Sequence, residues 1–278
     1  MKFIKMQGAG NDYVYVDCFT ETPDDDYAQL AVRLADRHFG VGGDGLVLVQ
    51  PSDVADGRMR MFNADGSESK MCGNAIRCVA KLLRDNGICA KNVVRIETGN
   101  GILTVERLKG DGGELYRVDM GEPILDAEKV PTKLTPTDGK TVIEAPLTVD
   151  GTQLKVTCVS MGNPHAVTFV EKIDDNLVLN IGKKVETNAN FPNRVNAEFA
   201  RIISKSEIEM RVWERGTGET LACGTGACAT LVAAVLTERA SPKATINLTG
   251  GKLEIEWDKK TNHVYMTGNA VEVFRGEI

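Results

Sequence analysis

Two cysteines, each followed by glycine, are the residues of this chain best suited to chemistry. Cys72-Gly73 and Cys223-Gly224 each stand directly before a segment with helical character. The first turn of a helix presents unpaired N–H groups and partial positive charge. These features lower the pKa of a thiol from about 8.5 toward neutrality, and they can hold a carboxylate. Each Cys-Gly pair therefore predicts a thiolate beside a carboxylate-binding site.

A thiolate next to a bound carboxylate fits removal of a proton from the carbon α to that carboxylate. The thiolate acts as the base, and the N–H groups stabilise the charge that moves onto the carboxylate oxygens. A second cysteine on the opposite face of the carbon returns a proton as a thiol, and the configuration inverts. The two cysteines must then hold opposite protonation states and titrate as a coupled pair. We therefore predict Cys72 and Cys223 as catalytic residues.

Both Cys-Gly pairs belong to an internal repeat, which separates this hypothesis from a simpler one. A single Cys-Gly pair could be only a tight turn before a buried thiol. Here the segment 62–73, FNADGSESKMCG, aligns without a gap on the segment 213–224, WERGTGETLACG. Upstream, at nearly the same offset, the segment 10–12, GND, aligns with 162–164, GNP, and Asp44 aligns with Asn196. Three landmarks in register predict two similar structural units.

Each copy of the repeat has the same coarse pattern of elements. Alternating or apolar stretches bounded by glycines and polar residues predict strands. The predicted strands are 2–7, 13–18, 46–50, 58–62, 93–97, 102–106, 115–120, 208–213, 244–248, 252–257 and 264–267. A helix follows each Cys-Gly pair, over 73–86 with Gly87 as its C-terminal cap, and over 224–238. The second helix is apolar on nearly all sides, which is typical of a buried helix.

These elements predict an α+β fold of two pseudo-symmetric lobes. Each lobe is expected to be a bent, mostly antiparallel sheet wrapped around one central helix. Peripheral helices are expected near 27–38 and 176–185. The length of 278 residues suits two lobes of ordinary size. We place the boundary at Gly121-Glu122-Pro123, which gives an N-terminal lobe over 1–122 with Cys72 and a C-terminal lobe over 123–269 with Cys223.

Composition excludes several classes of function. The formal net charge is −6 and the chain has no block of basic residues, which argues against a nucleic-acid partner. No apolar stretch follows the first six residues, so we expect no secretory signal. The longest apolar run, 227–236, is too short to span a bilayer. We therefore expect a cytoplasmic enzyme without a membrane partner.

The seven cysteines fit reduced thiols rather than a disulfide framework. No Cys-x-x-Cys pair is present and the three histidines are scattered, so we expect no metal site. Cys78 and Cys228 lie on the packed sides of the two central helices and are expected in the core. The same reading applies to Cys18, Cys89 and Cys158 as small buried apolar residues.

Several segments together resemble the diaminopimelate epimerase family. They are GAGND at 8–12, FNADG at 62–66, MCGN at 71–74, GNPH at 162–165, VN at 195–196, WERG at 213–216 and ACGTG at 222–226. They run across almost the whole chain in the order of the family. As a set they are specific, although each one alone is weak evidence.

The resemblance implies interconversion of LL- and meso-diaminopimelate in lysine and peptidoglycan-precursor biosynthesis, without pyridoxal phosphate, another cofactor or a metal. It implies that Cys72 and Cys223 are the two catalytic residues. It implies that a set of polar residues and glycines holds the substrate: Asn11, Asn63, Gly73, Asn74, Asn163, Asn196, Glu214, Arg215, Gly224 and Thr225. His165 and Glu214 are expected to tune protonation of the cysteines. The family also implies a homodimer and a C-terminal segment near 270–278 that returns to the first lobe.

These substrate-binding roles are chemically reasonable, and one position departs from the family. An arginine grips a distal carboxylate in bidentate fashion, and asparagine and glutamate can bind an ammonium group. Asn11 and Asn163 could instead be turn residues, and His165 a core histidine. Many family members carry glutamine directly after the aspartate of the first-lobe loop, where this chain has Gly45 after Asp44. No side-chain role is assigned to that position.

Other functions remain to be weighed. A proline or hydroxyproline racemase uses the same two-cysteine logic, but usually carries histidine at the position of Asn74. An isomerase of the phenazine-biosynthesis type lacks the cysteine pair. A thiol redox protein would cycle Cys72 and Cys223 through a disulfide, but no Cys-x-x-Cys motif supports it. A binding module with an inactive site is disfavoured by the intact cysteines and approach loops.

Overall fold

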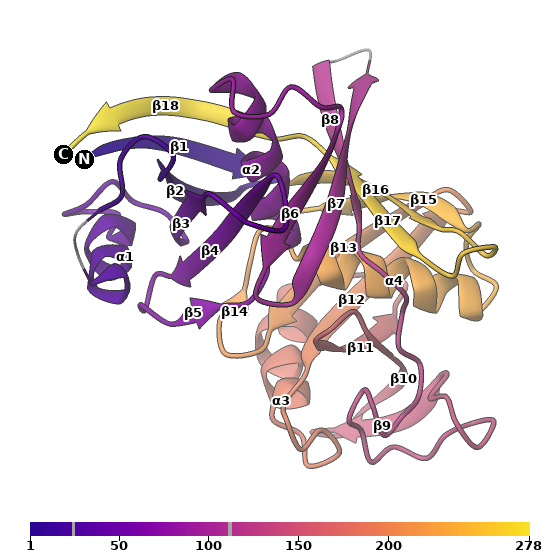
Figure 1. Ribbon diagram of the computed structural model, residues 1–278. Helices are drawn as coiled ribbons and strands as arrows, with labels where there is room; N and C mark the ends of the chain where they lie inside the picture. Colours follow the sequence, from indigo (N-terminus) through magenta and orange to yellow (C-terminus); the bar gives the residue numbers. More distant parts are fainter. Residues whose placement is uncertain (24–25, 111–112) are drawn as a thin grey trace. The chain divides into compact units, whose positions relative to one another are not determined.

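The computed structural model describes residues 1–23, 26–110 and 113–278 (Figure 1). Contacts divide the chain into two compact units. The first unit contains Met1–Asp119 and Thr267–Ile278, and the second contains Met120–Met266. The first part of unit one thus ends at Asp119, whereas the predicted N-terminal lobe ends at residue 122. That each unit is a separate lobe of an enzyme stays a prediction.

The first unit is a mostly antiparallel sheet around the helix α2 (Gly73–Asp85), with a short helix α1 (Tyr27–Ala35) at its side. Its strands are β1 (Lys2–Gly8), β2 (Asn11–Asp17), β3 (Gly45–Gln50), β4 (Gly57–Asn63), β5 (Glu68–Ser69), β6 (Val93–Thr98), β7 (Gly101–Gly110), β8 (Gly113–Asp119) and β18 (Val271–Glu277). Strand β2 pairs with β3 in parallel, and so does β4 with β6. The pairs β1–β2, β3–β4, β6–β7 and β7–β8 are antiparallel.

The second unit is built around the helix α4 (Gly224–Leu236). Its strands are β9 (Ala145–Val149), β10 (Thr152–Ser160), β11 (Pro164–Phe169), β12 (Asn196–Ser204), β13 (Glu207–Glu214), β14 (Gly218–Glu219), β15 (Lys243–Leu248), β16 (Gly251–Trp257) and β17 (Val264–Gly268), the last of which runs two residues past Met266. Strand β11 pairs with β12 in parallel, and so does β13 with β15. The pairs β9–β10, β10–β11, β12–β13 and β15–β16 are antiparallel.

The two units share one topology. The pairings of β10 to β16 repeat those of β1 to β7 strand for strand, including the two parallel pairs. The repeat also extends one strand further in each unit. Strand β9 pairs with β10 as β18 pairs with β1, so the C-terminal segment lies in the first unit beside the N-terminal strand (Figure 1). The α+β fold with two similar, mostly antiparallel sheets is confirmed.

Each central helix is the core of its unit. Helix α2 has a row of fully buried apolar side chains, which includes Ile76, Val79 and Leu83. Its end is fixed as predicted by Gly87, whose positive φ of 72° favours glycine. Helix α4 is buried on all sides over most of its length, because small and apolar residues predominate in it, whereas α2 carries the partly exposed Lys81 and Arg84 and the exposed Asp85. The predicted burial of α4 is confirmed.

Five cysteines lie in the cores, as predicted. Cys78 and Cys228 have no exposed surface, and Cys18, Cys89 and Cys158 are also buried. Burial raises the pKa of the Cys18 and Cys78 thiols to about 11 and that of Cys158 to about 12. These thiols are therefore protonated, apolar packing residues.

Two helix ends and the type of a third helix differ from the prediction. Helix α1 stops at Ala35 instead of residue 38, because the carboxylate of Asp36 accepts the backbone N–H groups of His38 and Phe39 and turns the chain. Helix α4 stops at Leu236 instead of residue 238. The helix expected over 176–185 is a π-type helix η1 (Asn176–Gly182) followed by the short helix α3 (Lys183–Glu186).

Candidate active site

Cys72 occupies the N-cap of helix α2. Its backbone is extended, with φ −138° and ψ 121°, so the chain enters the helix directly after it. The thiol is half-buried and donates a hydrogen bond to Oδ1 of Asn11 over 3.3 Å. Gly73 and Asn74 follow as the buried first turn of the helix. The helix N-terminus predicted at Cys72 is thus present, and the structure adds a specific amide partner for the thiol.

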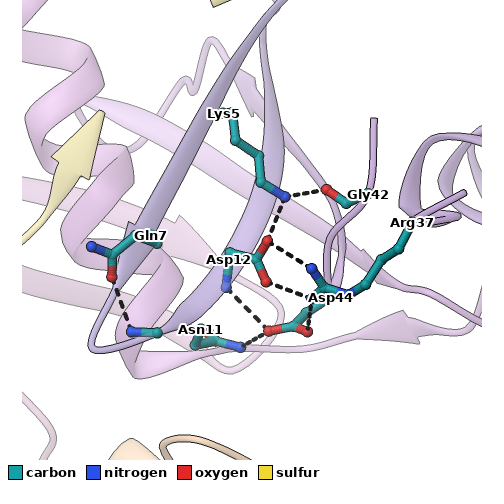
Figure 2. A network of polar contacts seen from close by, with 8 residues as sticks. Lys5, Gln7, Asn11, Asp12, Arg37, Gly42 and Asp44 are labelled. Atoms are coloured by element: carbon teal, nitrogen blue, oxygen red, sulfur yellow. Dashed lines mark hydrogen bonds and ion pairs between the residues drawn. The ribbon is translucent and has the colours of Figure 1, made fainter. Parts of the chain in front are cut away.

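Asn11 is itself held by Asp44 (Figure 2). The amide nitrogen Nδ2 of Asn11 donates to Oδ2 of Asp44 over 2.7 Å, and the backbone N–H of Asp12 donates to the same oxygen over 3.1 Å. This contact turns the other end of the amide, Oδ1, toward Cys72. Asp44 stands at the start of β3, which runs parallel to β2, so the sheet brings the two residues together.

A charged network supports Asp44 from the outer side (Figure 2). Arg37 contacts Oδ1 of Asp12 at 2.7 Å and Oδ1 of Asp44 at 3.2 Å. The buried ammonium of Lys5 contacts Oδ2 of Asp12 at 2.6 Å and donates to the carbonyl of Gly42. Two cations therefore balance two carboxylates, which keeps Asp44 in a position to accept from Asn11.

Gly45 cannot be exchanged for a residue with a side chain in this backbone. Its φ is 152°, in the region that favours glycine, and a Cβ there would lie 2.0 Å from the carbonyl oxygen of Phe62. The local backbone therefore explains why this chain has glycine where many family members have glutamine, because β3 approaches β4 closely at this point.

Asn63, at the end of β4, donates through Nδ2 to Ser67 at 3.0 Å rather than to Cys72.

Cys223 occupies the equivalent N-cap position of helix α4, with φ −113° and ψ 108°. Its sulfur accepts the N–H of Gly226 at 3.4 Å and lies 3.5 Å from Oγ1 of Thr225. The side chain is buried, with 5% of the residue exposed. The two cysteines therefore share a backbone position, and the sulfur of Cys223 receives an N–H group of its own helix.

The environment of Cys223 favours the thiol and corrects the expectation of a lowered pKa. Burial raises its pKa well above the ordinary value, and the carboxylate of Glu214 raises it further. Contacts with Thr225 and with the N–H of Gly226 act in the opposite direction and are smaller. The prediction considered the helix N-terminus alone, and desolvation of the charged form outweighs that effect here.

His165 and Asn163 lie together beside a buried glutamate. His165 has no exposed surface, and its Nε2 lies 3.0 Å from Oδ1 of Asn163. Its Nδ1 lies 2.6 Å from Oε1 of Glu198, which also has no exposed surface. His165 is thus a polar residue with two defined partners inside the unit, and Asn163 is fixed by it rather than being only a turn residue.

Asn196 and a second buried glutamate hold the Glu214-Arg215 loop. Oδ1 of Asn196 accepts the backbone N–H of Arg215 at 2.9 Å, while its Nδ2 donates to the carbonyl of Pro164. Glu186, 3% exposed, accepts from Trp213 Nε1 at 2.8 Å and from the N–H of Gly216 at 2.7 Å. The loop is therefore fixed on both sides of Arg215, whose side chain is exposed.

The structure brings the predicted residues together in two groups, one in each unit. Asn11, Cys72, Gly73 and Asn74 form the first group, and the others except Asn63 form the second. Three supporting carboxylates were not predicted as site residues: Asp44, Glu186 and Glu198. Only Asp44 had a sequence signal, because it aligns with Asn196 in the internal repeat.

The family model of diaminopimelate epimerase matches residues 3–125 and 157–273, which include both cysteines and both Cys-Gly turns. The chain belongs to the diaminopimelate epimerase family. Full-length relatives agree. The chain is 54% identical over its whole length to a diaminopimelate epimerase of Acetivibrio thermocellus, covering 98% of that protein. It is 53% identical to one of Desulfovibrio desulfuricans, again over the whole chain and 98% of the relative.

Solved structures show the same fold at low sequence identity. A phenazine biosynthesis protein of the PhzF family from Bacillus anthracis matches with a TM-score of 0.71 at 18% identity, over 100% of this chain and 98% of the other. A probable proline racemase from Agrobacterium radiobacter matches with a TM-score of 0.71 at 14% identity, over 100% and 92%. These matches show that the chain shares its fold with a protein of the PhzF family and with a probable proline racemase.

Membership of the diaminopimelate epimerase family makes the protein an isomerase that acts on a small molecule. Over residues 1–23, 26–110 and 113–278, no helix has the length and apolar character needed to cross a membrane. In the same part of the chain, no three His, Cys, Asp or Glu side chains gather as a metal ion would require.

Proposed function

We propose that this protein interconverts LL- and meso-diaminopimelate by a two-base proton transfer at the α-carbon. The observation that carries the proposal is the pair of cysteines at equivalent helix N-caps, one in each copy of the repeat. The choice of diaminopimelate as the substrate is supported by relatives of 50% identity and above that are named diaminopimelate epimerases. The reaction belongs to lysine and peptidoglycan-precursor biosynthesis and uses no pyridoxal phosphate.

The first turns of α2 and α4 supply the groups that hold charge during the reaction. Backbone N–H groups at Gly73-Asn74 and Gly224-Thr225 stabilise the carboxylate of the reacting amino-acid end as negative charge develops on it. Asn11, Asn63, Asn163 and Asn196 hold polar groups of the substrate. The exposed guanidinium of Arg215, next to Glu214, binds the distal carboxylate.

The environments of the two cysteines support an assignment of proton roles. Burial and the nearby carboxylate of Glu214 raise the pKa of Cys223, so it rests as the thiol and donates the proton. In a two-base reaction the other cysteine must then be the base. Cys72, which donates to Asn11 as a thiol in the structure, therefore removes the α-proton as a thiolate after it has released its own proton. In the reverse direction the roles exchange, because each turnover leaves Cys72 protonated and Cys223 as thiolate.

Three further features complete the proposal. The two structural units act as the two lobes of the enzyme, with one cysteine each. The protein works in the cytoplasm, where its thiols stay reduced. It forms a homodimer, as the family resemblance implies.

The test is deuterium incorporation followed by NMR. Purified, reduced protein is incubated with LL-diaminopimelate in D₂O without pyridoxal phosphate, beside Cys72→Ala, Cys223→Ala and the control Cys158→Ala. The wild type and the control should incorporate deuterium at the α-carbon and form the meso isomer, while neither active-site variant epimerises. Cys158 is a matched control because it is buried in the second unit away from a helix start.

Parallel incubations separate the alternatives. Proline and hydroxyproline are tested under the same conditions, and turnover of either with none of diaminopimelate would favour the related racemases. Activity is also measured with reductant and with oxidant. A thiol redox protein would gain activity on oxidation, whereas the proposed epimerase loses it.

A further inference from the structure

Glu198 is a buried carboxyl group to which the proposed reaction assigns no role. It lies on β12, next to β11, and the two strands run in parallel. The side chain has no exposed surface. Its Oε1 lies 2.6 Å from Nδ1 of His165, and its buried Oε2 has no hydrogen-bond partner among the described residues. Such a group is costly to bury as an anion, so its protonation state needs a specific account.

The geometry around His165 fixes how many protons the pair holds. Oδ1 of Asn163 is a carbonyl oxygen and can only accept, so Nε2 of His165 carries the proton in the contact at 3.0 Å. The contact between Nδ1 and Oε1 of Glu198 requires a second proton, on one atom or the other. The Glu198–His165 pair therefore holds two protons and has no net charge.

The surroundings decide where the second proton resides. The titratable groups that face Glu198 come from four neighbouring elements: His165 on β11, Cys158 on β10, Glu214 on β13, and Cys223 at the start of α4. Among them Glu214 is a carboxylate and opposes a second anion at Glu198, whereas the thiols of Cys158 and Cys223 are neutral. Burial is the largest effect and raises the pKa of Glu198, the contact with His165 lowers it without offsetting burial, and Glu214 adds a smaller rise. The proton is thus favoured on the carboxyl.

We propose that Glu198 is a positioning residue, a neutral carboxylic acid that donates to Nδ1 of His165 and fixes its imidazole as the Nε2–H tautomer. That tautomer donates to Oδ1 of Asn163 and so directs the Nδ2 end of this amide toward the substrate. The last step rests on the proposed function, in which Asn163 binds diaminopimelate. The protonation state of Glu198 does not depend on it.

A neutral pair also suits the proton cycle of Cys223. Glu198 and Cys223 both lie against Gly226, where a Cβ would be 2.8 Å from Oε1 of Glu198 and 3.2 Å from the sulfur. An ionised Glu198 beside a neutral imidazole would oppose the thiolate that forms at Cys223 after it donates its proton. The neutral pair removes that repulsion while leaving the site buried.

The direct test observes His165 by ¹⁵N NMR in the wild-type protein. His38 and His263 are replaced by glutamine one at a time to assign the three histidine signals. At neutral pH we expect Nε2 protonated and Nδ1 unprotonated but hydrogen-bonded. An imidazolium signal, with protons on both nitrogens, or a proton on Nδ1 alone, overturns the proposal. Infrared spectra add a second readout, a carboxylic-acid C=O band that is present in the wild type and lost in Glu198→Gln.

Two substitutions then test the positioning role. The amide of Glu198→Gln can still donate to Nδ1, so kcat/KM should stay within about threefold of the wild type. Glu198→Ala leaves Nδ1 without its donor, and kcat/KM should fall about tenfold, mainly through KM. Glu209→Ala, an outward carboxylate on β13 paired with Arg201, is the matched control and should have no effect.

The outcomes are separable from those of the proposed function. Equal losses in Glu198→Gln and Glu198→Ala would refute the neutral-donor role. If the wild type fails to epimerise diaminopimelate, the proposed function fails, and the NMR and infrared results still decide the state of Glu198. If Glu198→Ala does not fold, the wild-type spectra and Glu198→Gln remain decisive.

Discussion

Replacement of Asp44 by alanine should lower the rate of α-proton exchange without unfolding the protein. Asp44 accepts from Nδ2 of Asn11 at 2.7 Å, and this contact directs Oδ1 of Asn11 to the thiol of Cys72 at 3.3 Å. Without the carboxylate the amide is free to rotate. Cys72 then loses its fixed partner, and the base is no longer held in one position relative to the substrate.

The magnitude follows from the type of contact and its exposure. A hydrogen bond to a charged acceptor contributes about 1.5–3 kcal/mol. The side chain of Asp44 is 39% exposed, and water can replace part of the lost contact, so the lower end applies. About 1.5 kcal/mol corresponds to roughly a tenfold loss in kcat/KM. Asp44→Asn, which keeps an acceptor oxygen but not the charge, should lose less.

The assay is deuterium incorporation from D₂O into LL-diaminopimelate, with the alkylation rate of Cys72 measured by peptide mass spectrometry. Arg37→Ala is the matched control, since Arg37 touches the same carboxylate but its side chain is 57% exposed. Exposed ion pairs contribute about 0–1 kcal/mol, so this variant should lose less than about fivefold. The reasoning is wrong if Asp44→Ala keeps activity within about twofold, or if Arg37→Ala loses as much as Asp44→Ala.

Three further predictions concern stability. Glu186→Gln should lower the free energy of unfolding by about 1–3 kcal/mol, because three donors converge on this buried carboxylate; unchanged urea unfolding would contradict this. Gly45→Gln should lower the free energy of unfolding by about 1–3 kcal/mol, and Tm by several degrees, because the Cβ of the new side chain meets the carbonyl of Phe62. A Tm equal to that of the wild type would show that the backbone adapts. Alkaline pH should destabilise the fold between the ordinary thiol value of 9.0 and about 11, since Cys18 and Cys78 keep their protons when folded but ionise when unfolded. Urea titrations across that range test this, and the loss should be smaller in Cys78→Ala.

Much of the fold could be predicted from local patterns in the sequence. The gapless match of 62–73 with 213–224 predicted two units of one topology, and the observed pairings of β3–β4 and β12–β13 leading into the two Cys-Gly turns agree with it. The central helices could be predicted because their apolar spacing and their glycine signals are local. The strands β9 to β12 were not placed from the sequence. Long runs of buried residues in β10, β11 and β12 lack the alternation of polar and apolar residues that marks a strand in the sequence.

Glu198 shows why part of the site could not be predicted from the sequence. The strand β12 begins Asn-Ala-Glu-Phe-Ala, and these five residues are all buried. A strand covered on both faces has no alternation of polar and apolar residues, so its one acidic residue reads as an ordinary surface charge. The carboxyl group of Glu198 is buried because neighbours on β11 and at the start of α4 pack against it. The same holds for Glu186, whose partners come from a loop about thirty residues away.

The internal repeat places the two cysteines at equivalent positions, and the residues that differ between its two copies give the cysteines different surroundings. Identical surroundings would give Cys72 and Cys223 the same proton affinity, and a two-base reaction needs one thiolate and one thiol. The first unit places an amide oxygen on a half-buried thiol, supported by Asp44. The second places a buried thiol near Glu214 and Glu198. At the position where the first copy of the repeat has Asp44 the second has Asn196, which binds the backbone of Arg215 instead. The residues that distinguish the two copies therefore give the two cysteines different surroundings, and exchanging Asp44 for the asparagine of the second copy would test whether the first of these surroundings governs proton transfer at Cys72.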